Sequence, residues 1–236
     1  ATKAIAVSEF TRDKLKKNFP SLSVSVINNS IDHALYDLSA PSLRSRQFEI
    51  LTVGRLSTHE GYKGHNLVID AVALLKQRKI NVHYNIVGTG DALENLTNYA
   101  ESKGVANLVE FHGYIEDSNI TSIYARSSLF VMPSFVVERE NDEWSGEGFG
   151  LVYLEAAAHG LPSVACREGG QVDAVIDGVT GTLISPCVKE LAGAIEDYYL
   201  NPAKLKKVAS AAKKNCLENH SQEIFKENLV RELLSI

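Results

Sequence analysis

The chain has 236 residues, of which 44% are apolar and 22% are charged, and its formal net charge is −5. This composition is ordinary for one large globular domain, and the acidic balance excludes a general basic surface for nucleic acid. No apolar run reaches the roughly 18 residues that a membrane-spanning helix requires. Three scattered cysteines without a Cys-x-x-Cys pair favour a reducing compartment and exclude the usual zinc spacing.

The first part of the chain alternates strand, helix and strand. Residues 3–8 and 23–29 predict strands, residues 9–19 between them predict a helix, and Ser8 is a suitable N-cap. The polar stretch 37–47 contains a proline and predicts a linker. Because the chain does not begin with Met and its first residues run directly into a strand, we expect a fragment of a longer protein.

From residue 48 onward, short apolar stretches alternate with longer amphipathic ones. The apolar stretches predict strands at 48–54, 81–88, 108–113, 128–134, 161–166 and 180–185. The amphipathic stretches predict helices at 64–78, 91–104, 117–127, 150–159, 170–177, 188–201, 202–219 and 221–236. A long loop, 135–146, follows the fourth of these strands.

These strands are continuous apolar runs without polar alternation, which is typical of strands that helices bury on both faces. Strict alternation of strand and helix predicts an α/β fold, a Rossmann-like parallel sheet with helices on both faces. Ligands of such sheets bind beyond the carboxyl ends of the strands. Functional residues are therefore expected in the loops that follow the strands.

Charged residues and glycines gather in these loops. Arg55 and Lys63 follow the strand 48–54, the turn "GTGD" follows 81–87, and "GEGFGL" (146–151) opens the helix at 150. Glycines let a ligand approach the backbone, and free N–H groups at a helix start attract phosphate. Two cations opposite such a helix start would form a cradle for a diphosphate without a metal ion.

Glu155 lies inside an apolar helix. With Leu151 at 0°, Glu155 falls at about 40° and Leu154 at about 300°, so the carboxylate points into the apolar face. An unpaired carboxylate there would cost several kcal/mol. Either a buried partner inside the protein satisfies it, or a ligand with paired hydroxyls, such as a ribose, does.

The order of the motifs resembles one family, the retaining glycosyltransferases of family 4. The resemblance covers their C-terminal, nucleotide-sugar-binding domain and runs from about residue 48 to residue 200. It rests on "EGFGLVYLEAAAHGLPSVA", in which seven residues separate Glu147 from Glu155, on "GRL…KG", "IVGTG" and "FHGYI" before it, and on "VIDGVTGTLISP" after it.

The resemblance implies a GT-B fold, of which this chain would hold one half. The expected division is 1–38, the end of the N-terminal acceptor domain with the crossover, 39–220, the nucleotide-sugar-binding domain, and 221–236, a C-terminal helix. The remainder of the N-terminal domain would be missing from this chain.

The resemblance also implies roles for individual residues. Arg55 and Lys63 would bind the donor diphosphate and stabilise the leaving nucleotide, Glu147 would contact the donor sugar, and Glu155 would accept hydrogen bonds from the ribose. The remaining pocket residues would be Gly54, Gly88, Gly90, Tyr114, Ile115, Phe149, Gly150 and Leu151, the last five through backbone groups or at the border of the base.

The implied reaction transfers a sugar from a UDP- or GDP-sugar to a glycan or glycolipid with retention of configuration. No metal and no other cofactor is expected, because two cations and a helix start supply the positive charge and no Asp-x-Asp motif is present. The intact enzyme is expected in the cytoplasm, in the synthesis of surface polysaccharide or lipopolysaccharide. The lysine-rich stretch 204–214 is either a solvated helix face or a contact with acidic lipid at the inner face of the membrane.

Three features leave alternatives open. Asp173 stands where the family often has Glu, and since Asp is shorter we leave it out of the site. The acidic loop 135–146 is either a solvated loop or a lid that offers Trp144 to a sugar. The resemblance implies a GDP-mannose-like donor here, because a comparably long loop occurs in some members of the family, including mycobacterial-type mannosyltransferases. His65 and His59 are either structural or within reach of phosphate.

Two other functions fit the same fold. One is a sugar phosphorylase or nucleotide-sugar epimerase, and the other is a non-catalytic module that binds a sugar nucleotide. Both glutamates, Arg55 and Lys63 are present, which argues against the second. The chain by itself is expected to bind nucleotide without appreciable transfer, because the acceptor domain must close the site.

Overall fold

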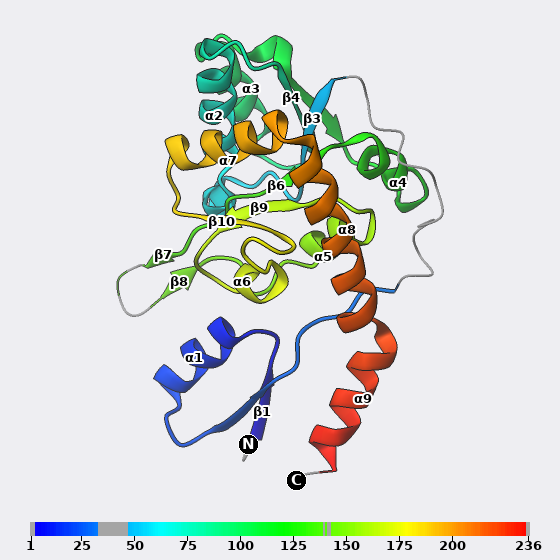
Figure 1. Ribbon diagram of the computed structural model, residues 1–236. Helices are drawn as coiled ribbons and strands as arrows, with labels where there is room; N and C mark the ends of the chain where they lie inside the picture. Colours follow the sequence, from blue (N-terminus) through cyan, green and yellow to red (C-terminus); the bar gives the residue numbers. More distant parts are fainter. Residues whose placement is uncertain (1–2, 33–46, 139, 141–142, 235–236) are drawn as a thin grey trace.

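The computed structural model of the protein describes residues 3–32, 47–138, 140 and 143–234 (Figure 1). Its centre is a six-stranded sheet in the order β10-β9-β6-β3-β4-β5, and every neighbouring pair in it is parallel. The strands are β3 (Phe48–Val53), β4 (Val82–Val87), β5 (Val109–Gly113), β6 (Leu129–Val131), β9 (Ser163–Cys166) and β10 (Gly181–Ile184). The predicted parallel α/β fold is confirmed.

Helices cover both faces of this sheet (Figure 1). The helices are α2 (His65–Gln77), α3 (Leu93–Ser102) and α7 (Val188–Leu200) on one face, and α4 (Asp117–Arg126), α5 (Leu151–Ala158) and α6 (Gln171–Ala174) on the other. Helix α8 (Pro202–Asn219) belongs to both layers, since Leu205 packs with the first set and Cys216 with the second. Adjacent strand residues enter opposite layers: Ile50 packs with α2 and α7, whereas Leu51 packs with α4 and α5. This double burial explains why the strands are apolar without alternation.

A smaller unit precedes the sheet. It consists of β1 (Lys3–Ala6), α1 (Glu9–Asn18) and β2 (Ser23–Val26), and β1 and β2 pair in parallel. Ser8 caps α1 as predicted, since its side chain accepts from the N–H of Thr11 at 3.1 Å. The linker predicted at 37–47 and the proposed boundary at 38/39 lie almost entirely outside the described residues.

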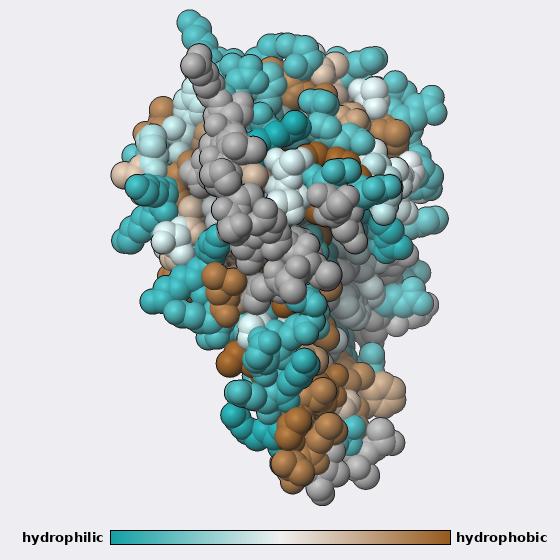
Figure 2. All heavy atoms as spheres, turned by 90° about the vertical axis from the view of Figure 1, so that its right-hand side faces the viewer, coloured by the Kyte–Doolittle hydropathy of each residue, from teal (hydrophilic) through white to brown (hydrophobic). Residues whose placement is uncertain are grey.

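The last helix returns to this smaller unit. Helix α9 (Gln222–Leu233) begins at the N-cap Ser221, and Lys3 Nζ lies 2.6 Å from Glu232 Oε1. Hydrophobic side chains gather at this end of the molecule (Figure 2). The exposed ones on α1, β1 and α9 and next to these elements are Ile5, Phe19, Val230, Leu233 and Leu234.

Several short elements differ from the expectations. The loop 135–146 contains two paired antiparallel strands, β7 (Val137–Glu138) and β8 (Trp144–Ser145). The residues between Arg55 and α2 form a 3₁₀ helix, η2 (Thr58–Lys63), and η3 (Ala106–Leu108) precedes β5. Among the described residues, no helix has the length and apolar character needed to cross a membrane.

Candidate functional site

The loop after β3 brings the two predicted cations to one carboxylate. Lys63 Nζ lies 3.0 Å from Glu60 Oε2, and Arg55 pairs with the other oxygen of the same side chain. The side chain of Lys63 is 11% exposed and that of Glu60 is 15% exposed, whereas that of Arg55 is 77% exposed. The sequence analysis did not identify Glu60, although it lies between the cations that were predicted to bind a diphosphate.

The ammonium group of Lys63 lies close to Gly54. A Cβ atom at Gly54 would lie 3.5 Å from Lys63 Nζ, so the lysine folds back over the end of β3. Its charge therefore lies at the carboxyl edge of the sheet, where ligands of parallel sheets bind. The following Gly64 has a φ of 77° and gives α2 its start.

The next loop packs directly on this one. Gly88 and Gly90 have φ values of 142° and 157°, and a Cβ at either would lie about 2 Å from the carbonyl oxygens of Gly54 and Leu56, respectively. The N–H of Leu56 donates to the carbonyl of Thr89 at 2.9 Å. Close packing of the two loops thus explains why glycine is required at both positions, without any ligand. The predicted contact of these glycines with the sugar nucleotide stays a prediction.

The glycine turn before α5 holds the carboxylate of Glu147. The backbone N–H groups of Gly148 and Phe149 stabilise its charged form. Burial raises the pKa of Glu147, while the nearby charge of Lys63 lowers it and that of Glu60 raises it again. The structure thus brings Glu147 into the same charged cluster as Lys63 and Glu60.

Helix α5 begins directly after this turn. Gly150 caps it with a φ of 89°, and Leu151, its first residue, is 45% exposed. The side chain of Phe149 is only 2% exposed and packs in the core, so a ligand can reach this residue only through its backbone. No described side chain caps this helix start, and free N–H groups at a helix start attract anions, so its contact with a phosphate stays a prediction.

Glu155 lies one turn further along α5 and is half-buried rather than enclosed in the apolar face. The hydroxyl of Tyr124, on α4, donates to Glu155 Oε2 at 2.9 Å. This hydrogen bond shows how the carboxylate is satisfied without a ribose. A protein partner and a ribose are therefore compatible as alternatives for Glu155, because the side chain binds Tyr124 and is still partly exposed.

The two residues after β5 lie differently. Tyr114 is 75% exposed, whereas Ile115 is half-buried and packs against the core on the α4 and α5 side. An exposed aromatic ring at the carboxyl edge of the sheet is suited to contact with a base or sugar.

Two open alternatives are resolved by the structure. His65 is buried, and burial, with a smaller effect of Lys63, lowers its pKa to about 4, so the ring is neutral at pH 7 and is no cation for phosphate. Trp144 packs edge-on against Phe10 of α1, with ring centroids 4.9 Å apart, and Lys14 lies over both rings. The idea that Trp144 offers a free face to a sugar is wrong for this arrangement.

No metal centre is formed by the described residues, since none of their His, Cys, Asp and Glu side chains group in threes that could hold an ion. The three cysteines are free thiols, and two of them are buried. The candidate site therefore consists of the cations Arg55 and Lys63, the carboxylates of Glu60 and Glu147, and the start of α5.

The fold and the edge loops define a Rossmann-like α/β domain of the GT-B type. Ligands of parallel α/β sheets bind at the carboxyl ends of the strands, where these loops lie. A model of the family "Glycosyl transferases group 1" matches residues 38–215, which is more than half of the chain. The chain belongs to this family.

Curated relatives agree with this assignment. The GDP-mannose-dependent alpha-(1-6)-phosphatidylinositol monomannoside mannosyltransferase of Mycolicibacterium smegmatis is 31% identical over 221 residues, which cover 90% of this chain and 57% of that protein. Glycogen synthase of Mycobacterium tuberculosis is 32% identical over 212 residues, which cover 89% of this chain and 48% of that protein. The chain spans about half the length of the curated relatives it matches.

Solved structures share the fold. HepE of Anabaena, in complex with UDP, superposes with a TM-score of 0.81 at 26% identity and covers 100% of this chain and 64% of its own. Sucrose-phosphate synthase of Thermosynechococcus elongatus has a TM-score of 0.81 at 22% identity, with 100% and 59% covered, which shows the fold alone.

Proposed function

We propose that this chain is the donor-binding part of a retaining glycosyltransferase of family 4, which transfers a hexose from a nucleoside-diphosphate sugar. The observation that carries the proposal is the charged cluster at the carboxyl edge of the sheet. Arg55 and Lys63 meet at Glu60, and Lys63 and Glu60 both act on Glu147 in the turn that opens α5. Such a cluster matches a ligand with two phosphates and a neutral sugar.

The chemistry follows from these charges. The bond between the anomeric carbon and the phosphate oxygen breaks, and its electron pair stays on the departing diphosphate. Arg55, Lys63 and the start of α5 stabilise this growing negative charge more than the ground state. The acceptor oxygen attacks from the same face, and its proton passes to the leaving phosphate. Glu147 would orient the sugar through its hydroxyls, and Glu155 would orient the ribose.

The donor is proposed to be a UDP- or GDP-sugar. The mycobacterial relative is named for GDP-mannose, and HepE was solved with UDP and with UDP-glucose. The length of the 135–146 segment favours a GDP-mannose-like donor. The acceptor is proposed to be a glycan or glycolipid of a surface polysaccharide, and the intact enzyme to work in the cytoplasm or at the inner face of the membrane.

The proposal includes a further acceptor domain in the whole protein, with 1–38 as its end, 39–220 as the donor domain and 221–236 returning to it. The exposed apolar side chains of β1 and α9, Ile5, Val230 and Leu233 among them, would lie under that domain. Closure of the two domains would exclude water and bring in the acceptor.

Calorimetry tests the proposal directly. UDP, GDP, ADP, UDP-glucose and GDP-mannose are titrated into the chain with EDTA present, and at least one nucleotide and its sugar are expected to bind. Absence of binding by all five ligands to this chain and to the intact protein would refute the proposal. Transfer by this chain alone is expected to be negligible, and robust turnover would contradict the requirement for the acceptor domain.

A further inference from the structure

Two hydroxyl groups of α1 meet one carbonyl oxygen of the glycine turn. Ser8 Oγ donates to the carbonyl oxygen of Gly148 at 2.6 Å, and Thr11 Oγ1 donates to the same atom at 3.2 Å. Ser8 has no exposed surface. The contact joins residues that are 140 and 137 positions apart and ties the smaller N-terminal unit to the turn that carries Glu147.

Helix capping explains only part of this contact. As N-cap, Ser8 Oγ accepts from the backbone N–H of Thr11. Since a hydroxyl can accept and donate at once, its proton remains available for Gly148. Thr11 Oγ1 lies 3.0 Å from Ser8 Oγ and 3.2 Å from the Gly148 oxygen, so the two hydroxyls and the carbonyl form one cluster, whereas the cap itself uses only the backbone N–H of Thr11.

The shared carbonyl belongs to the peptide group between Gly148 and Phe149. This peptide is trans, and in a planar trans peptide the C=O and N–H point in opposite directions. A hydrogen bond that fixes the carbonyl therefore also fixes the N–H of Phe149, which stabilises the charged form of Glu147. Gly170 closes off another side of this peptide, because a Cβ there would lie 1.9 Å from the Gly148 oxygen.

We propose that Ser8 and Thr11 are positioning residues for Glu147, acting through the peptide group between Gly148 and Phe149. The inference rests on the proposed function, in which Glu147 contacts the donor sugar. It means that the sugar-binding carboxylate is aimed correctly only while α1 is docked on the nucleotide-binding domain. Donor recognition and the relative position of the two units are thereby linked.

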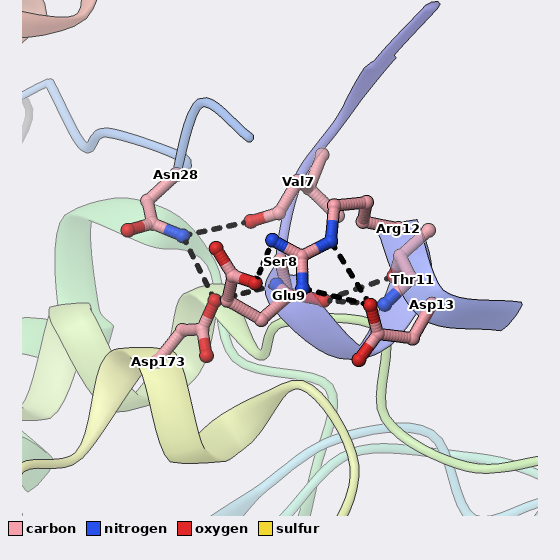
Figure 3. A network of polar contacts seen from close by, with 8 residues as sticks. All are labelled: Val7, Ser8, Glu9, Thr11, Arg12, Asp13, Asn28 and Asp173. Carbon is pink, nitrogen blue, oxygen red and sulfur yellow. Dashed lines mark hydrogen bonds and ion pairs between the residues drawn. The ribbon is translucent and has the colours of Figure 1, made fainter. Parts of the chain in front are cut away.

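A second tie docks the same unit without touching this peptide (Figure 3). The N–H of Glu9 donates to Asp173 Oδ2 at 2.8 Å, and Asn28 Nδ2 donates to the same oxygen at 3.3 Å. Asp173, which the sequence analysis left out of the site, thus holds the start of α1 and the segment after β2 on α6. Asp173 holds the N-terminal unit in place, whereas the hydroxyls of Ser8 and Thr11 contact the Gly148 carbonyl, so the two effects can be tested separately.

The test compares the affinity for a nucleotide sugar with that for its nucleotide. Calorimetry with UDP and UDP-glucose, and with GDP and GDP-mannose, gives the sugar increment as the ratio of the two dissociation constants. Thr11→Val deletes one donor and leaves the cap intact, whereas Thr11→Ser keeps the hydroxyl. We expect Thr11→Val to reduce the increment roughly three- to tenfold, with nucleotide affinity unchanged, and Thr11→Ser to retain it.

Ser8→Ala provides a second variant, which removes the other donor along with the cap. Thermal unfolding and nucleotide affinity report whether it is folded; if it is not, the Thr11 pair still decides. Lys14→Met is the matched control, since it breaks the 3.2 Å ion pair between Lys14 and Glu138 in the same interface and leaves Gly148 alone. Its sugar increment is expected to equal that of the unaltered chain.

A pH series separates positioning from a general loosening. The N–H groups of Gly148 and Phe149 lower the pKa of Glu147, so a misaligned Phe149 N–H raises the pH at which the sugar increment is half lost. We expect this midpoint to move upward in Thr11→Val and to stay in Thr11→Ser.

The outcomes separate the two proposals. An unchanged increment and midpoint in Thr11→Val overturn the positioning role alone, as does the same loss in Lys14→Met. An unaltered chain that binds nucleotide but gains nothing from the sugar also overturns it, because Glu147 then has no sugar to orient. An unaltered chain that binds neither nucleotide nor nucleotide sugar overturns the proposed function, and the positioning role with it.

Discussion

The two loops that meet at the candidate site are held by different kinds of contact. The loop after β3 is held by charged side chains: Lys63 and Arg55 pair with Glu60, and both oxygens of Asp91 accept from Thr58. The turn before α5 is held by its backbone: the N–H of Gly170 donates to the carbonyl of Glu147 at 2.7 Å, and Gly148 receives two hydroxyls. One loop can exchange partners, and the other is fixed before a ligand arrives.

This difference suits the two parts of a nucleoside-diphosphate sugar. A diphosphate is charged, so it can replace Glu60 as the partner of Arg55 and Lys63. A sugar is neutral and is recognised by the direction of hydrogen bonds, which a rigid turn preserves. The first loop therefore determines how tightly the nucleotide binds, and the second determines how well the sugar is oriented.

Removal of Lys63 should have the largest effect on the first loop. Hydrogen bonds to charged groups contribute about 1.5–3 kcal/mol, so Lys63→Met is expected to weaken UDP or GDP binding about tenfold to more than a hundredfold. Calorimetry measures the change, and Lys207→Met, at an exposed position of α8, is the control. Equal affinities for Lys63→Met and the unaltered chain would break the assignment of the cationic loop to the diphosphate.

The histidine at the start of α2, His65, is kept neutral at pH 7 mainly by its burial. Burial lowers the pKa of His65 to about 4, against 6.5 in an unfolded chain. As the pH falls from about 6.5 to about 4, the unfolded state binds a proton on His65 and the folded state does not. The free energy of unfolding therefore decreases over this pH range. The loss approaches about 3 kcal/mol at pH 4 and below.

Thermal and urea unfolding across this pH range check the effect. His65→Gln should flatten the pH dependence relative to the unaltered chain, whereas His59→Gln, at an exposed position of η2, should leave it steep. A curve for His65→Gln that stays parallel to that of the unaltered chain would show that the pKa of the ring is the same in the folded and the unfolded state.

Glu155, on α5 after the rigid turn, is proposed to bind the ribose, and its substitution tests this role. Glu155→Ala is expected to weaken nucleotide binding about tenfold, and to abolish any preference for the ribonucleotide over its 2′-deoxy analogue. Tyr124→Phe removes the 2.9 Å bond to Glu155 but keeps the carboxylate, so it should preserve that preference. If Glu155→Ala discriminates as well as the unaltered chain, the carboxylate serves packing between α4 and α5 and not the ribose.

The fold followed from sequence because its determinants are local and repeated. Apolar strands such as 48–54, followed by amphipathic helices, specify a parallel sheet wherever they occur in this order. Arg55 and Lys63 were predicted in the same way, since both lie in the loop that follows the strand 48–54, whereas the role of Glu147 was implied by the family resemblance. The paired strands β7 and β8 were missed because two residues carry no periodic pattern.

Contacts between distant segments were beyond this kind of reasoning. Ser8 was identified as a helix cap, but its second bond depends on Gly148, 140 positions away. Glu60 in "THEGYKG" looks like an ordinary loop carboxylate until η2 is known to be helical. The segment bends at Glu60, whose φ and ψ are −108° and 31°, and in this bent arrangement its carboxylate reaches Lys63, three residues further on.

The smallest effect concerns this missed carboxylate. Glu60 neutralises part of the charge that a diphosphate needs, and the net contribution of a surface ion pair is on the order of 1 kcal/mol. Glu60→Gln should therefore bind UDP, GDP and inorganic pyrophosphate about fivefold more tightly. Glu101→Gln, an exposed change of equal charge on α3, controls for net charge. Tighter binding would show that Glu60 competes with the ligand, whereas weaker binding would show that it mainly holds Arg55 and Lys63 in place; the first loop would then be as preorganised as the second.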